Sequence, residues 1–153
     1  MKMTVDLDQV KSWMRGEEFD ITLSRTKKSR TLKQEFFTPT DYIEQKLNLM
    51  DPEIFSDPTV PVLDNMMGSC QILSEVLIKR MEHGLSYEDS IQTLFGLDLS
   101  FDNVTVSRRR MSLGEEKYQK ICEKNFQQAD ALRIESFTRF KPVNFGNNLF
   151  TIE

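Results

Sequence analysis

The sequence is poor in the residues on which several common kinds of site depend. It contains one histidine and two cysteines, Cys70 and Cys122, which are too few and too far apart for a zinc cluster or a disulfide framework. A hydrolytic catalytic triad is not expected, because it needs a histidine beside a nucleophile and the chain has one histidine with no obvious nucleophile partner. No apolar stretch is long enough to span a bilayer, and the first residues, MKMTVD, lack the apolar core of a secretion signal. We therefore expect a cytoplasmic protein with no metal site and no membrane contact.

What is present is the composition of an ordinary globular domain. Hydrophobic residues make up 39% of the 153-residue chain and charged residues 29%, with a formal net charge of −4, which is typical of one soluble domain. Segment 24–33 differs, because it carries five basic residues and no acidic one. Such a segment either contacts nucleic-acid phosphates or is a solvated loop. The candidate DNA-binding residues are Arg25, Lys27, Lys28, Arg30 and Lys33.

The most informative stretch is residues 60–73, VPVLDNMMGSCQIL. Branched side chains at 60–63 predict a short buried strand that ends at an acid, Asp64. Gly68 allows a tight turn, and Ser69 is placed to cap a helix that we expect over 70–81. This order begins many nucleotide-binding folds, in which backbone N–H groups at the turn face the ligand. Any α/β domain also needs such turns, so both interpretations stay open.

The rest of the chain alternates between helical and strand patterns. We expect helices at 4–15, 40–50, 86–94, 102–111 and 115–123, a turn-rich linker at 51–58, and further strands at 94–99 and 125–132. Helices followed by a βαβαβ order predict an α/β fold with a parallel sheet. Asp64, Asp98 and Asp130 follow the three strands and would converge where such sheets bind ligands. They either bind a nucleoside, with Asp98 on the ribose hydroxyls, or cap helices.

These motifs resemble the adenine-N6 DNA methyltransferases that use S-adenosylmethionine, in the compact form often carried by bacteriophages. Four segments occur in the family's order: FFTP at 36–39, VLDxxxGSxxIL at 62–73, FGLDLxxDNV at 95–104 and NxxxADAL at 125–132. The resemblance implies a Rossmann-like methyltransferase fold with an incomplete parallel sheet over residues 36–153. Residues 1–35 would add an N-terminal helix and the basic segment. For a phage protein the location would be the host cytoplasm.

The resemblance also implies roles for the residues at matching positions. Phe37, Thr38 and Pro39 would pack on the methionine part of S-adenosylmethionine. Asp64, Gly68 and Ser69 would form the turn that lies beneath it. Asp98 would bind the ribose, and Leu99 would lie near the adenine. Asp130 and Ala131 would address the amino group and ring of an adenine.

The chain departs from the family at two places. The family's turn reads DPxCGSG, and its final glycine is Cys70 here, whose side chain would narrow the space in which backbone approaches the ligand. The catalytic motif N/D-P-P-Y/F, which receives a flipped adenine, is absent, because the sequence has no Pro-Pro pair. Asn144-Phe145 is a poor substitute for it, so no catalytic residue is assigned.

Three functions follow as hypotheses. The first is a degenerate methyltransferase-like protein, non-catalytic alone, which acts as a binding protein or partner subunit and whose binding of S-adenosylmethionine is weak or lost. The second is an active DNA adenine-N6 methyltransferase completed by a partner chain. The third is a pure protein-interaction module.

An incomplete sheet would also leave one edge of the strand at 60–63 open. We expect residues 145–152 to fold back over that edge, or a second copy of the chain or another protein to cover it. Self-association is the favoured outcome. The expected contact residues are Phe137, Phe140, Phe145, Leu149 and Phe150.

Overall fold

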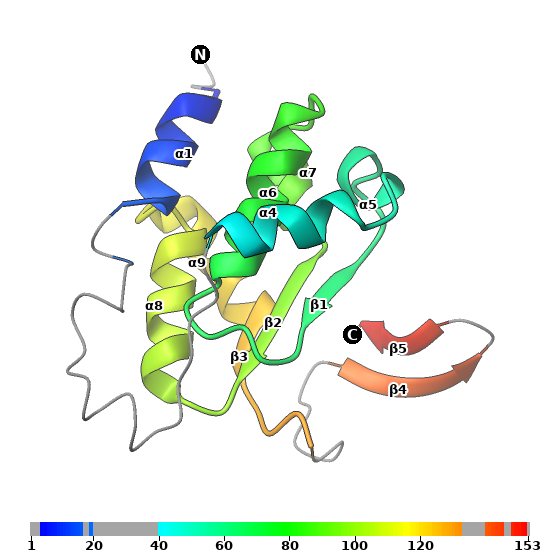
Figure 1. The fold of residues 1–153 in the computed structure, drawn as a ribbon. Helices are drawn as coiled ribbons and strands as arrows, with labels where there is room; N and C mark the ends of the chain where they lie inside the picture. The colour runs from blue at the N-terminus through cyan, green and yellow to red at the C-terminus, as the bar shows by residue number, and fades with distance from the viewer. Residues whose placement is uncertain (1–3, 17–18, 20–39, 133–139, 146–147, 153) are drawn as a thin grey trace.

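The helices and strands follow the predicted α/β alternation (Figure 1). The computed structural model describes residues 4–16, 19, 40–132, 140–145 and 148–152. Phe37, Thr38, Pro39 and the basic residues of segment 24–33 therefore lie outside the described residues. The elements are α1 (Leu7–Met14), α4 (Thr40–Asn48), α5 (Glu53–Ser56), β1 (Val62–Asp64), α6 (Gln71–Glu82), α7 (Tyr87–Ile91), β2 (Leu94–Asp98), α8 (Phe101–Met111), α9 (Glu116–Asn125), β3 (Phe126–Gln128), β4 (Phe140–Phe145) and β5 (Asn148–Ile152).

Three parallel strands form the main sheet, in the order β1-β2-β3. The central strand, β2, is buried along its first four residues, whereas β1 is half-buried. Within the described part of the chain no strand lies on the outer side of β1, so its edge is open as expected. β1 begins at Val62 rather than at residue 60. Pro61 has no N–H to donate, and the Val60 carbonyl accepts from the Arg80 guanidinium instead.

Two expectations about the connecting segments are wrong, and one of the alternatives for the open edge of β1 is not the one observed. The linker at 51–58 contains a short helix, α5, whose start is supported by the Glu53 N–H bonding to the Asp51 carboxylate. β3 ends at Gln128 rather than residue 132, because the Asp130 side chain accepts the Leu132 N–H and turns the chain. Residues 148–152 pair antiparallel with β4 as a separate two-stranded sheet and do not cover β1.

The main core lies between the helices and one face of the sheet. Leu73 and Leu77 of α6, Val104 of α8 and Phe126 of β3 are fully buried in it. The alternate residues of β2, Phe95 and Leu97, point to the other face, because successive side chains of a strand alternate. They pack with Leu63 and Ala129 in a second, smaller cluster. Among the described residues no helix is both long enough and apolar enough to cross a membrane.

A buried arginine holds the chain where it enters β1. Arg80 of α6 is fully buried, and its Nε donates to the Ile54 carbonyl at 2.8 Å. Nη2 donates to the Val60 carbonyl at 2.7 Å, while Nη1 donates to the Ser90 carbonyl and to Thr93 Oγ1. One side chain thus satisfies carbonyls from α5, α7 and the approach to β1. This network fixes where β1 starts relative to the helices.

Candidate functional site

The three predicted acids lie at the carboxyl edge of the sheet, where parallel strands end together (Figure 1). Asp64 closes β1, Asp98 closes β2, and Asp130 follows β3 by two residues. The Ala129 N–H donates to the Asp98 carbonyl at 3.0 Å, which ties the segment after β3 to the end of β2. This edge is the site expected from the sequence.

The Asp98 carboxylate is already engaged by the protein. Its Oδ2 accepts the Gly68 N–H at 2.9 Å. Its Oδ1 accepts the Ser100 N–H at 2.8 Å and the Asn103 amide at 3.2 Å. A carboxylate has about four lone-pair directions, so these bonds leave about one. Accepting both hydroxyls of a ribose would therefore break at least one of these bonds.

The Asp64 carboxylate, unlike that of Asp98, has one oxygen without a hydrogen-bond partner. Its Oδ1 accepts the Met66 N–H at 3.0 Å, while its Oδ2 is buried and has no hydrogen-bond partner. Burial raises the pKa of the Asp64 carboxyl, the Met66 bond opposes that shift, and the charge of Asp98 adds to it. An unpartnered buried oxygen favours the protonated form or a donor supplied from outside.

The turn between β1 and α6 adopts two left-handed residues. Gly68 has φ +55°, and Cys70 has φ 61° and ψ 31°. Helix α6 consequently begins at Gln71, and its N-cap residue is Cys70, which makes no side-chain capping bond. The expectation that Ser69 caps this helix is wrong. Ser69 is buried, and its carbonyl and hydroxyl oxygens accept from Arg110 Nη1 instead.

Met67, rather than Cys70, fills the space between the turn and the sheet. The Cys70 side chain is fully buried in the core, with its Sγ 3.6 Å from Met67 Sδ. The Met67 N–H donates to the Leu97 carbonyl at 2.9 Å, and its side chain lies over Gly96 of β2. A Cβ added to Gly96 would come within 2.3 Å of Met67 Sδ. The side chain that narrows this turn is therefore that of Met67, not that of Cys70.

Helix α8 supports the turn from beneath with two polar side chains. The Ser107 hydroxyl donates to the Gly68 carbonyl at 2.8 Å. The buried Arg110 donates to the Ser69 carbonyl and also to the Met14 carbonyl at the end of α1. Neither Ser107 nor Arg110 was expected at the site from the sequence. Their signal was helical spacing, because residues 103, 107 and 110 share the buried face of α8.

The residues predicted to lie near an adenine are exposed or engaged locally. Asp130 Oδ1 accepts the Leu132 N–H, and Ala131 is half-buried beside it. Leu99 is exposed, while its carbonyl accepts the Gln128 side-chain amide at 3.0 Å. These hydrogen bonds thus bring Asp98 together with Gly68, whereas the Asp130 side chain bonds within its own turn.

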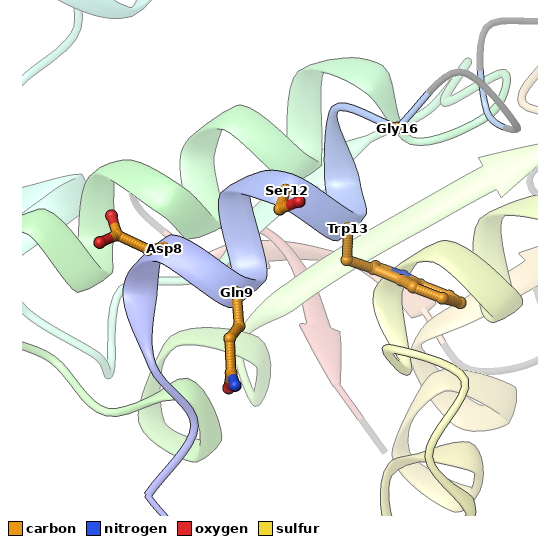
Figure 2. A pocket seen from close by; sticks show the side chains of 5 residues that line it. All are labelled: Asp8, Gln9, Ser12, Trp13 and Gly16. Carbon is orange, nitrogen blue, oxygen red and sulfur yellow. The ribbon is translucent and has the colours of Figure 1, made fainter.

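An open hollow of about 530 Å³ lies elsewhere, along α1. Its lining residues are Asp8, Gln9, Ser12, Trp13 and Gly16 (Figure 2). The Trp13 indole N–H donates to the Arg110 carbonyl at 3.0 Å, so this ring also serves to dock α1 on α8. None of these residues was predicted to belong to a site, and the set holds a single titratable side chain, Asp8. The carboxyl edge therefore remains the candidate site.

Comparison of the chain with protein-family models, with curated proteins and with solved structures finds no match.

Proposed function

We propose that the chain is a degenerate methyltransferase-like protein that transfers no methyl group alone and acts by binding a partner. The main support for this proposal is the 2.9 Å hydrogen bond from the Gly68 N–H to the Asp98 carboxylate. In nucleotide-binding α/β folds, the turn amide and the acid after the second strand face the ligand. Here the two groups bind each other. S-adenosylmethionine binding is accordingly weak or lost.

The packing of Met67 supports the same proposal. Its side chain is buried against Gly96, so the turn lies directly on the central strand. Opening a cavity there would expose a methionine that is otherwise buried, which costs about 1.5–3 kcal/mol. A cofactor would have to repay that cost before it gained affinity.

The absence of a base-binding motif also favours a non-catalytic role. These 153 residues contain no Pro-Pro pair, and the family's motif uses a proline carbonyl and an aromatic ring to hold the flipped adenine. An active DNA adenine-N6 methyltransferase would need a partner chain to supply those groups. The candidate DNA contact through segment 24–33 is a proposal from charge alone, because its residues lie outside the described residues.

The open edge of β1 supports association with a second copy or another protein. Its outward backbone groups have no strand beside them within the described residues, and unpaired strand edges are templates for pairing. We expect light scattering over a range of concentrations to give a mass above that of one chain. A monomer at every concentration would contradict self-association.

Calorimetry and methyl transfer test the central proposal. S-adenosylmethionine titrated into the full chain should give no saturable heat at micromolar ligand. Duplex DNA incubated with the chain and methyl-labelled S-adenosylmethionine should stay unlabelled. The matched comparison is Met67→Ala, which removes the side chain that lies over Gly96 and should bind the cofactor more tightly than wild type. Label in the DNA with wild-type protein alone would overturn the proposal.

A further inference from the structure

Four large apolar side chains are exposed at the carboxyl edge of the sheet. The exposed fractions are 79% for Met66, 70% for Leu99, 61% for Phe101 and 94% for Leu132. We call these four residues the apolar rim. Met66 follows β1, Leu99 and Phe101 follow β2, and Leu132 follows β3. Single exposed apolar residues are ordinary, but four on the consecutive loops of one sheet edge offer apolar surface to a partner.

Hydrogen bonds hold the three loops of the rim together. The Gly68 N–H bond to Asp98 joins the loop after β1 to the end of β2. The bond from the Gln128 amide to the Leu99 carbonyl joins the loop after β2 to the end of β3. Neighbouring strands lie about 4.8 Å apart, so these bonds hold the three loops that carry the rim side by side.

The described part of this edge carries acidic side chains. The described residues of the three loops, 64–68, 98–102 and 129–132, include Asp64, Asp98, Asp102 and Asp130 and no lysine or arginine. The Asp64 Oδ2 atom is buried and the pKa of that carboxyl is raised, so the negative charge rests on the other three aspartates. Their carboxylates would repel nucleic-acid phosphates, and a second copy docked on the same rim would face like charges. A complementary occupant carries positive charge together with apolar side chains.

The size of the rim points to a short segment. Four side chains make a patch of a few hundred Å², roughly. A stable contact between two globular copies buries about 800 Å² on each partner. An amphipathic helix, by contrast, needs only a few anchors at helical spacing to dock on an apolar surface.

We propose that the apolar rim docks a basic amphipathic segment of a partner protein. This inference rests on the proposed function, because it names the class of partner and the surface that receives it. The apolar side of the segment covers Met66, Leu99, Phe101 and Leu132. Its basic residues lie beside the aspartates that flank the rim. Binding needs no opening of the turn below.

A labelled peptide of defined composition tests the proposal. The probe is a 14-residue amphipathic helix with lysines on one face and leucine and phenylalanine on the other, and fluorescence anisotropy measures its binding to the full chain. We expect micromolar affinity that weakens with added salt. The double variant Leu99→Ser/Phe101→Ser should weaken binding at least ~10-fold, as loss of central apolar anchors does, and Asp102→Lys should also weaken it.

The matched control is Leu49→Ser, because Leu49 is 88% exposed but lies beyond the end of α4. It should leave the affinity unchanged, and thermal melting verifies that every variant folds. No binding, equal loss in the control and rim variants, or no loss in the rim variants would overturn the proposal. So would competition by duplex DNA that depends on the same rim residues. These outcomes are independent of the calorimetry and methyl-transfer results, so the two proposals fail separately.

Discussion

Replacing Gly96 by alanine tests the packing on which the proposed function depends. Gly96 lies in the middle of β2, and its backbone needs no left-handed conformation. An added Cβ would meet Met67 Sδ at 2.3 Å, Phe126 Cδ1 at 3.1 Å and Leu73 Cδ1 at 3.2 Å. The Phe126 and Leu73 contacts are tight but need only small shifts. The Met67 contact requires that side chain to move.

Two opposing effects set the expected change in stability of Gly96→Ala. Overpacking a buried site costs about 1–3 kcal/mol, while replacing glycine by alanine restricts the unfolded chain and returns about 0.4–1 kcal/mol. We expect Gly96→Ala to lower the free energy of unfolding by about 1–2 kcal/mol on this balance. Met67→Ala alone should cost about 2–5 kcal/mol, because it removes a buried methionine.

The double variant gives the decisive measurement. In Gly96→Ala/Met67→Ala the new methyl group occupies part of the space that Met67 leaves. The combined loss should therefore be smaller than the sum of the single losses by at least about 1 kcal/mol. Urea unfolding followed by the fluorescence of Trp13, the one tryptophan of the chain, gives each value.

A second cycle serves as the control. Leu47 is buried on α4, and none of its atoms is among those nearest to a Cβ added at Gly96. The losses of stability in Gly96→Ala and Leu47→Ala should therefore add in the double variant within about 0.5 kcal/mol. Additivity in the Met67 cycle would show that Met67 does not fill the space over Gly96. The argument that the turn is closed against a cofactor would then fail.

Three other predictions concern single side chains. Cys70→Gly should change the free energy of unfolding by at most about 1 kcal/mol, because relief of the left-handed conformation offsets lost burial, whereas Cys70→Val should be clearly destabilising in the same urea assay. Asp64 has a raised pKa when folded, so its contribution to stability is full below its ordinary value of 3.8 and is lost as the pH rises. The stability of Asp64→Asn relative to wild type should therefore increase from acid to neutral pH. The hydrogen bonds from Thr59 lower the pKa of the Asp57 carboxyl, so the stability of Asp57→Asn relative to wild type should decrease over the same range. Arg80→Met should lower stability by about 3–5 kcal/mol, since it leaves several buried carbonyls without donors, and a change below about 1 kcal/mol in calorimetric melting would contradict that role.

Much of the alternation of helices and strands could be predicted from local signals. The apolar spacing of α6 and the run at 94–98 gave the right element types, and the Ser86 hydroxyl accepts the Asp89 N–H at the start of α7 as a capping residue should. The start of α8 was placed one residue late. Ser100 caps it, because its hydroxyl accepts the Asn103 N–H.

The interior of the turn could not be predicted in the same way. Gly68 and Asp98 are 30 residues apart, and their bond depends on how β2 lies beside β1, which no local pattern specifies. Capping chemistry favoured Ser69, yet the left-handed conformation of Cys70 moved the start of α6 by one residue. Arg110 is the last of three successive arginines, and helical spacing sends this one into the core.

The energetics of the turn support the proposal that the chain binds a partner rather than a cofactor. A cofactor that used Gly68 and Asp98 would first break their charge-assisted bond, which costs about 1.5–3 kcal/mol. Displacing Met67 from Gly96 would cost about 1.5–3 kcal/mol more. Since each 1.4 kcal/mol is a factor of ten, the apparent affinity falls by about 10²- to 10⁴-fold, and a micromolar site becomes one of about 0.1–10 mM. The apolar rim carries no such penalty, because Met66, Leu99, Phe101 and Leu132 are already exposed. Under the proposed function, the closed turn that disfavours a small ligand would also serve as the support for a macromolecular partner.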